Sequence, residues 1–227
     1  MIGLRFLRRL VRSRSGVAMT EFALGAPFLL VTGLWGTEVA NYALVNMKIG
    51  QLAVHIADNA SRIGDTSTLQ NRKIYESDIN DVIVGAQIQA GGLDLYDNGR
   101  VIISSLEVNE EGEQYIHWQR CRGAKTVGSS YGDEGDVVDD GMGPDGEEVL
   151  AQEGEAVIFV ELQYTYQPMI WGKVFTNREI RSIASFTVRD NRDLSEIHQR
   201  STTDPDAIQR CNVNTGNVVI DQDGTVN

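Results

Sequence analysis

The sequence predicts an α+β protein in which a long N-terminal helix packs on a small antiparallel β-sheet, with one extra helix. Two patterns carry this prediction. Apolar residues recur at three- and four-residue steps well beyond an initial apolar run, which is typical of one long helix. Later in the chain, four short runs alternate apolar and polar side chains, which is typical of strands with one buried face. That face needs a cover, and the amphipathic half of the helix can supply it.

The chain begins with a basic leader, residues 1–16. Five arginines and no acids precede Gly16, so the positive-inside rule keeps this end in the cytoplasm. From Val17 to Trp35 the chain is apolar over 19 residues, close to the ~20 that a helix needs to cross a bilayer. Glu21 interrupts this run. A charge within lipid costs roughly 2.5–3.5 kcal/mol on insertion scales, so we expect Glu21 to be functional and to have a partner.

The helix is expected to continue beyond the membrane and to cover residues 17–63, with Gly64 and Asp65 as its stop. A helix of this length would be roughly 70 Å long at 1.5 Å per residue. Its first half would be bare in lipid and its second half would pack on a domain. The apolar stripe of the second half consists of Tyr42, Val45, Ile49, Leu52, Ile56 and Ile63.

A second helix is predicted over residues 77–90, with Ser77 as its N-cap and two glycines, Gly91 and Gly92, at its end. It belongs to an ectodomain that we expect to cover residues 64–200.

Four strand-like runs follow the second helix. The third is the clearest, because apolar and polar residues alternate between Ala156 and Gln167. The fourth alternates between Ile180 and Arg189. The first two runs have shorter apolar sets: Ile102, Leu106 and Val108 share one side of the first, and Ile116 and Trp118 share one side of the second. One-sided alternation predicts an antiparallel sheet with one wet face.

Between the second and third runs lies an acidic, glycine-rich loop, residues 128–155. Its carboxylates could offer oxygen ligands to calcium, but they do not match the spacing of an EF-hand. The composition favours a solvated loop, and no metal site is predicted. The last segment, residues 201–227, is a polar tail.

The two cysteines, Cys121 and Cys211, lie beyond the membrane segment and lack the paired spacing of a zinc site. In an exported protein one structural disulfide is the simplest interpretation, with two unpaired buried thiols as the alternative. The disulfide would close a loop of about 90 residues and would hold the tail.

Charge and motifs exclude several classes of function. The net charge is −12, and removal of residues 1–16 takes it to −17. Such an acidic domain should repel nucleic acid, whose binding needs a basic surface. The sequence has no metalloprotease, serine-hydrolase, Walker or Rossmann motif, and its three histidines are far apart. We therefore expect no catalytic residues, no cofactor and no enzymatic activity.

The residues from Arg12 to Phe22 resemble the leader of type IV prepilins, in which a membrane peptidase cuts after a glycine and glutamate is the fifth mature residue. The short Arg/Ser leader and the Gly-x-x-x-x-Glu-aromatic pattern are similar, more narrowly, to TadE-like pseudopilins of tight-adherence (Tad, Flp) pili. The resemblance implies cleavage between Gly16 and Val17 and an assembly role for Glu21. Phe22 stands where the major pilins of this family have tyrosine.

The resemblance covers about 30 residues, and it implies a minor pilin or pseudopilin that takes part in pilus assembly for surface adherence. Its expected partners are a prepilin peptidase, other pilins and the inner-membrane pilus machinery. The chain would cross the bacterial inner membrane once, with a cytoplasmic N-terminus and a periplasmic domain, and could enter the pilus. The alternative is a signal-anchored periplasmic domain with binding or enzymatic activity, which would need neither Gly16 nor Glu21.

Overall fold

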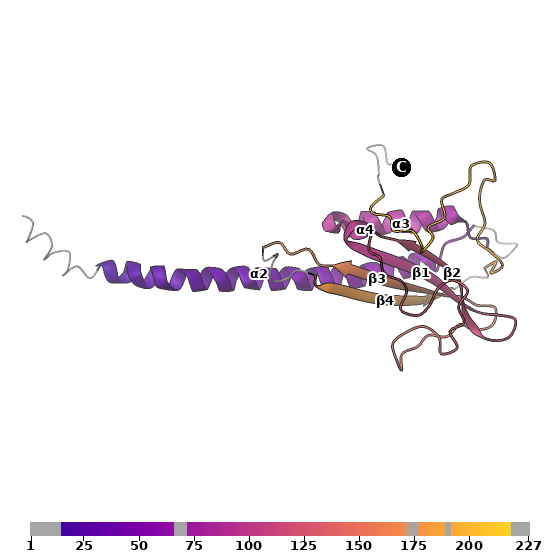
Figure 1. Cartoon of the computed structure of the whole chain (residues 1–227), viewed down its shortest axis with the longest axis horizontal. Coiled ribbons are helices and arrows are strands. Elements are labelled where there is room, and N and C mark those ends of the chain that lie inside the picture. Colours follow the sequence, from indigo (N-terminus) through magenta and orange to yellow (C-terminus); the bar gives the residue numbers. More distant parts are fainter. Residues whose placement is uncertain (1–14, 66–71, 171, 173–176, 189–191, 219–227) are drawn as a thin grey trace, which may run out of the picture.

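The structure is a computed structural model of the 227-residue chain, and it describes residues 15–65, 72–170, 172, 177–188 and 192–218. Most of the basic leader and the end of the tail therefore lie outside the described residues. The predicted α+β fold is confirmed. A long helix projects from a domain that consists of a four-stranded sheet and one further substantial helix (Figure 1). The elements are α2 (Ser15–Ala60), α3 (Glu76–Ala90), the 3-10 turn η1 (Gly91–Leu93), α4 (Leu95–Asn98), β1 (Gly99–Val108), β2 (Gln114–Arg122), β3 (Val157–Thr165) and β4 (Glu179–Thr187).

Helix α2 is one continuous element of 46 residues and includes Pro27. It ends at Ala60, three residues before the predicted end. There the Ser61 hydroxyl donates to the Asp58 carbonyl (2.7 Å), and the Arg62 amide donates to the Asn59 carbonyl (3.0 Å). The chain thus tightens into a turn before it reaches the glycine that was predicted to stop it.

Helix α3 begins one residue earlier than predicted and does not use Ser77 as its cap. The N-cap is Tyr75, whose backbone N–H donates to the Asp78 carboxylate (3.1 Å). Acids in the first turn, here Glu76 and Asp78, are stabilised by the helix dipole. Ser77 lies inside the helix, and its hydroxyl accepts a hydrogen bond from Arg200 (2.7 Å). The prediction that Ser77 is the N-cap was wrong, because the helix begins at Glu76 and Ser77 is already its second residue.

The sheet is antiparallel throughout, with strand order β2-β1-β3-β4. The pairing of β1 with β2 is irregular: Ser105 lies opposite Trp118, whereas Leu106 lies opposite Ile116. The irregularity is a β-bulge that places one extra residue, His117, in β2. Side chains on either side of it therefore alternate out of step and point to opposite faces of the sheet. Trp118 and Ile116 therefore lie in two different hydrophobic clusters, which corrects the prediction that they share a side.

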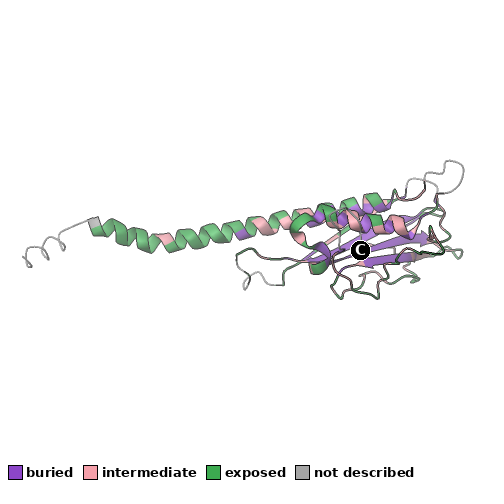
Figure 2. Cartoon of the chain, turned by 90° about the horizontal axis from the view of Figure 1, so that it is seen from above, coloured by how far each residue is buried: buried purple, intermediate pink, exposed green. Residues whose placement is uncertain are grey.

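The main core lies between the sheet and the two helices α2 and α3. The stripe predicted on α2 is confirmed: Ile49, Leu52 and Ile56 are buried, and its remaining members are half-buried against the same cluster. From the sheet, alternate residues of β3 such as Val160 and Leu162 face this cluster. Figure 2 shows the result, since the first half of α2 is exposed and its buried residues lie from Glu38 onward, mostly where the helix packs on the domain.

The opposite face of the sheet is exposed along β4, as predicted, but it is buried along β1 and β3. The one-sided prediction is therefore wrong for these two central strands. The carboxylates of the acidic loop are exposed, as predicted, whereas several of its apolar side chains are buried. On β3, Val157 and Phe159 alternate with the helix-facing residues and are also buried. The loop of residues 128–155 covers them with Tyr131, Met142 and Ala151, while most of its acids stay exposed. The loop lies on the side of the strands away from α3 (Figure 1). It is held there because its apolar side chains complete a second, smaller core.

Candidate functional site

The N-terminal half of α2 is bare. Between Gly16 and Thr37 every residue is exposed except the half-buried Ala26. The exposed set includes large apolar side chains such as Phe22, Phe28 and Leu29. A surface this apolar is not stable in water and marks a membrane or protein contact. The helix is long and apolar enough to cross a membrane and so indicates membrane anchoring or a signal sequence.

The residues predicted for processing and assembly all lie at the start of this bare half. Gly16 and Val17 are in the first turn of α2, and both are exposed. Glu21 is four residues after Val17, which in a helix places the two on the same face, one turn apart. Phe22 is exposed beside it. The local helix is continuous here, and the Thr20 hydroxyl donates to the Val17 carbonyl (2.8 Å). The structure thus presents these four residues together on one accessible helix end.

A second acid in α2, Glu38, marks the point where the helix enters the domain. Its side chain is completely buried. One carboxylate oxygen, Oε1, accepts hydrogen bonds from the Tyr166 hydroxyl (2.6 Å) and the Met169 backbone N–H (3.2 Å). The other oxygen, Oε2, accepts one from the Ile170 backbone N–H (2.8 Å). We call this arrangement the Glu38 clasp, since it fastens the chain that follows β3 to the helix.

The clasp is supported by neighbouring side chains of α2. Asn41 donates from Nδ2 to the Tyr166 hydroxyl oxygen (2.7 Å), and the Tyr42 ring packs edge-on against the Tyr166 ring at 5.1 Å. Burial, and next the hydrogen bond to Glu38, raise the pKa of Tyr166 to about 12. The hydroxyl is therefore protonated and donates at neutral pH. Burying a carboxylate is costly unless it is well hydrogen-bonded, and these donors offset that cost.

Sequence reasoning missed Glu38. The available signal was an acid three residues past Trp35, the end of the apolar run. Its donors come from a segment about 130 positions later in the chain, so no local pattern connects them.

The predicted disulfide between Cys121 and Cys211 is present, with Cα atoms 4.7 Å apart. It joins β2 to the tail and indicates an extracytoplasmic domain. The tail has other anchors as well. The buried guanidinium of Arg100 donates to the Cys211 carbonyl (2.5 Å) and to the Asn214 side chain. Further hydrogen bonds join Arg122 to Gly216, Asp97 to Asn217, and Gln87 to Val218.

A buried ion cluster joins α3 to the sheet. The Arg120 guanidinium contacts both oxygens of Glu76, with the shortest distance 2.6 Å, and contacts Glu134 of the acidic loop at 2.8 Å. Arg120 and Glu76 are almost completely buried, whereas Glu134 is 45% exposed. The cluster fixes α3, β2 and the acidic loop relative to one another.

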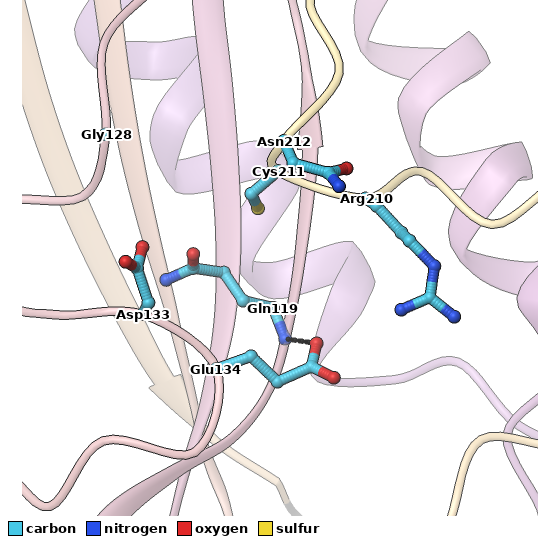
Figure 3. Close-up of a pocket in the computed structure, with 7 residues that line it drawn as sticks. All are labelled: Gln119, Gly128, Asp133, Glu134, Arg210, Cys211 and Asn212. Carbon is cyan, nitrogen blue, oxygen red and sulfur yellow. Dashed lines mark hydrogen bonds between the residues drawn. The ribbon is translucent and has the colours of Figure 1, made fainter.

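Near the disulfide, a cavity of about 390 Å³ opens between the acidic loop and the tail. Figure 3 shows Asp133 on the loop side and Arg210 on the tail side, with the Gln119 backbone N–H donating to Glu134 between them (3.0 Å). The lining consists of Gln119, Gly128, Asp133, Glu134, Arg210, Cys211 and Asn212. It combines charges of both signs and has neither a histidine nor a hydroxyl nucleophile.

The three histidines lie apart. His117 contacts Glu107 (2.8 Å), His198 contacts Asp193 (3.3 Å), and His55 is exposed on α2. In the part of the chain that the structure describes, no three His, Cys, Asp or Glu side chains are grouped to hold a metal ion.

Comparisons with protein-family models, with curated proteins and with solved structures each found no match to this chain.

Proposed function

We propose that this chain is a TadE-like minor pilin or pseudopilin that takes part in assembly of a Tad-type pilus for surface adherence. The observation that carries the proposal is the bare half of α2, which presents Gly16, Val17, Glu21 and Phe22 on an exposed helix end. The same helix continues into a disulfide-bonded domain, so one continuous helix joins a membrane segment to an exported domain.

The assembly chemistry follows from the spacing of two charges. Cleavage after Gly16 leaves an α-amine on Val17, with an ordinary pKa of about 8 and therefore mainly cationic at neutral pH. In a single subunit, Glu21 lies one turn from this amine at the edge of lipid. In an assembly, Glu21 can meet the amine of an adjacent pilin in a low dielectric, where opposite charges attract more strongly than in water. The pair favours one axial register between neighbouring helices.

The proposed partners are a prepilin peptidase, other pilins or pseudopilins, and the inner-membrane pilus machinery. The N-terminus lies in the cytoplasm and the disulfide-bonded domain in the periplasm of a bacterial cell. No enzymatic role is proposed.

Processing is tested by N-terminal sequencing of the protein extracted from membranes. We expect Val17 as the first residue. Gly16→Val should block cleavage, since a β-branched side chain does not fit a peptidase site shaped for glycine. A chain that starts at Met1, or near Pro27, contradicts the proposal.

Assembly is tested by cross-linking to partner pilins and by surface attachment. Glu21→Ala and Glu21→Gln should insert and be cleaved normally but should fail to cross-link and to support attachment. Thr32→Ala, a polar change elsewhere on the bare helix, is the control and should behave as the wild type. Normal cross-linking and attachment with Glu21→Ala would refute the assembly role and favour a signal-anchored domain.

A further inference from the structure

Two apolar side chains directly after β3 are exposed although their backbone is firmly held. Met169 is 70% exposed and Ile170 is 42% exposed. Their backbone N–H groups both donate to the buried Glu38 carboxylate, at 3.2 and 2.8 Å. The clasp holds the pair in a fixed position beside α2.

The position of the clasp along α2 relates it to the membrane. The apolar run ends at Trp35, and Glu38 follows three residues later, about 4.5 Å further along a helix. The polar interface of a bilayer is on the order of 5–8 Å deep on each side of the hydrocarbon core. When the apolar run spans the membrane, Glu38 and the two side chains beside it are therefore at the depth of the lipid headgroups. In Figure 1 the chain after β3 extends along α2 toward its bare half.

We propose that Met169 and Ile170 are a second membrane contact, which enters the headgroup region of the bilayer that α2 crosses. The inference rests on the membrane-spanning role of α2 in the proposed function. Its occupant is the lipid surface, because the pair is apolar, exposed and fixed beside α2 only three residues after the apolar run ends. An exposed cation lies at the base of the same loop, since the Tyr166 N–H donates to the Arg178 carbonyl (2.8 Å). An exposed cation at the base of this loop suits lipid phosphates, whereas most of the domain is acidic.

The contact has a mechanical consequence. With α2 as the only connection, the domain could rotate about the helix and tilt toward the bilayer. A second contact, fixed to the helix by Glu38, sets the height and the rotation of the domain above the membrane. The domain of a subunit waiting in the membrane is then held in one orientation for docking.

The test uses the full chain in vesicles of phosphatidylethanolamine and phosphatidylglycerol, with an environment-sensitive fluorophore on Met169→Cys. The native cysteines are joined in the disulfide and do not react with the label. The matched control is Val137→Cys, an exposed apolar position on the acidic loop. That loop lies beside the sheet, away from the bare half of α2 (Figure 1). We expect a blue-shifted emission at position 169 and quenching by nitroxide-labelled headgroups, with neither effect at position 137.

Adding Glu38→Ala to Met169→Cys should abolish the quenching, because the loop is no longer held against the helix. Near-UV circular dichroism confirms that each variant has folded. Equal, water-like emission at positions 169 and 137 overturns the membrane contact, and unchanged quenching with Glu38→Ala overturns the role of the clasp. Neither result affects the Glu21 cross-linking test. Normal assembly with Glu21→Ala together with selective quenching at 169 would refute the pilin role and leave the contact standing.

Discussion

Arg120→Met should destabilise the domain strongly, because it leaves a buried carboxylate without its cation. In the wild type, Arg120 Nη2 lies 2.6 Å from one oxygen of Glu76, and Nε lies 3.1 Å from the other. The Glu76 side chain is only 3% exposed. Methionine retains much of the apolar volume of arginine, so the change removes the charge and its donors with little loss of packing.

The magnitude follows from the burial of each partner. Removing one member of a buried, hydrogen-bonded ion pair costs roughly 3–5 kcal/mol. The Glu134 contact adds at most about 1 kcal/mol, since that carboxylate is 45% exposed and is screened by solvent. A domain of this size is stable by roughly 5–15 kcal/mol, so the change removes a large share of the stability.

The assay is urea unfolding of the full chain in mild detergent, followed by circular dichroism. Glu134→Gln is the matched control and should cost less than about 1 kcal/mol. The double variant Glu76→Met/Arg120→Met should be more stable than Arg120→Met alone, because no unpaired charge remains. A loss with Arg120→Met as small as that with Glu134→Gln would refute the reasoning, since it would mean that Glu76 reaches water.

Two further predictions concern the tail and the β1–β2 pair. Replacing both Cys121 and Cys211 by alanine should lower the free energy of unfolding by up to about 4–5 kcal/mol, the chain-entropy value for a loop of this length. Membrane retention should be unchanged. Urea titrations measure the free energy and fractionation measures the retention, and an unaltered free energy of unfolding would contradict the prediction. The hydrogen bond to Glu107, opposed by burial, raises the pKa of His117 in the folded protein. The stabilisation that protonated His117 contributes is therefore complete below its unfolded pKa of about 6.5 and is lost as pH rises through its folded pKa. His117→Gln should therefore cost more stability at pH 5.5 than at pH 9 in paired urea titrations, and an equal cost at both pH values would contradict the assignment.

Local patterns were sufficient for the elements and for the disulfide. The stripe from Ile49 to Ile56 predicted the packed half of α2, because a helix buries residues at three- and four-residue steps whatever its neighbours are. Alternation predicted the strands for the same reason. The disulfide could be predicted because only two cysteines exist and both follow the membrane segment.

The faces of the sheet could not be predicted so simply. One extra residue in β2 moves Trp118 to the face opposite Ile116, and a period-two pattern cannot show such an irregularity in advance. The acidic loop was predicted to be solvated because its carboxylates dominate its composition. Its few apolar residues, such as Met142, are buried only because they pack against Val157 and Phe159 on the second apolar face of the sheet.

The sequence by itself determined a long helix with a bare apolar end, an acid at position 21, and an exported α+β domain with one disulfide. These features depend on spacing and composition over short stretches, where backbone geometry and transfer from water dominate. Only the tertiary structure decided that Glu38 is buried by Tyr166, Met169 and Ile170, and that Arg120 joins Glu76 to Glu134. A buried charge is stable only when donors or counter-charges meet it, and those groups come from segments that the fold alone brings together.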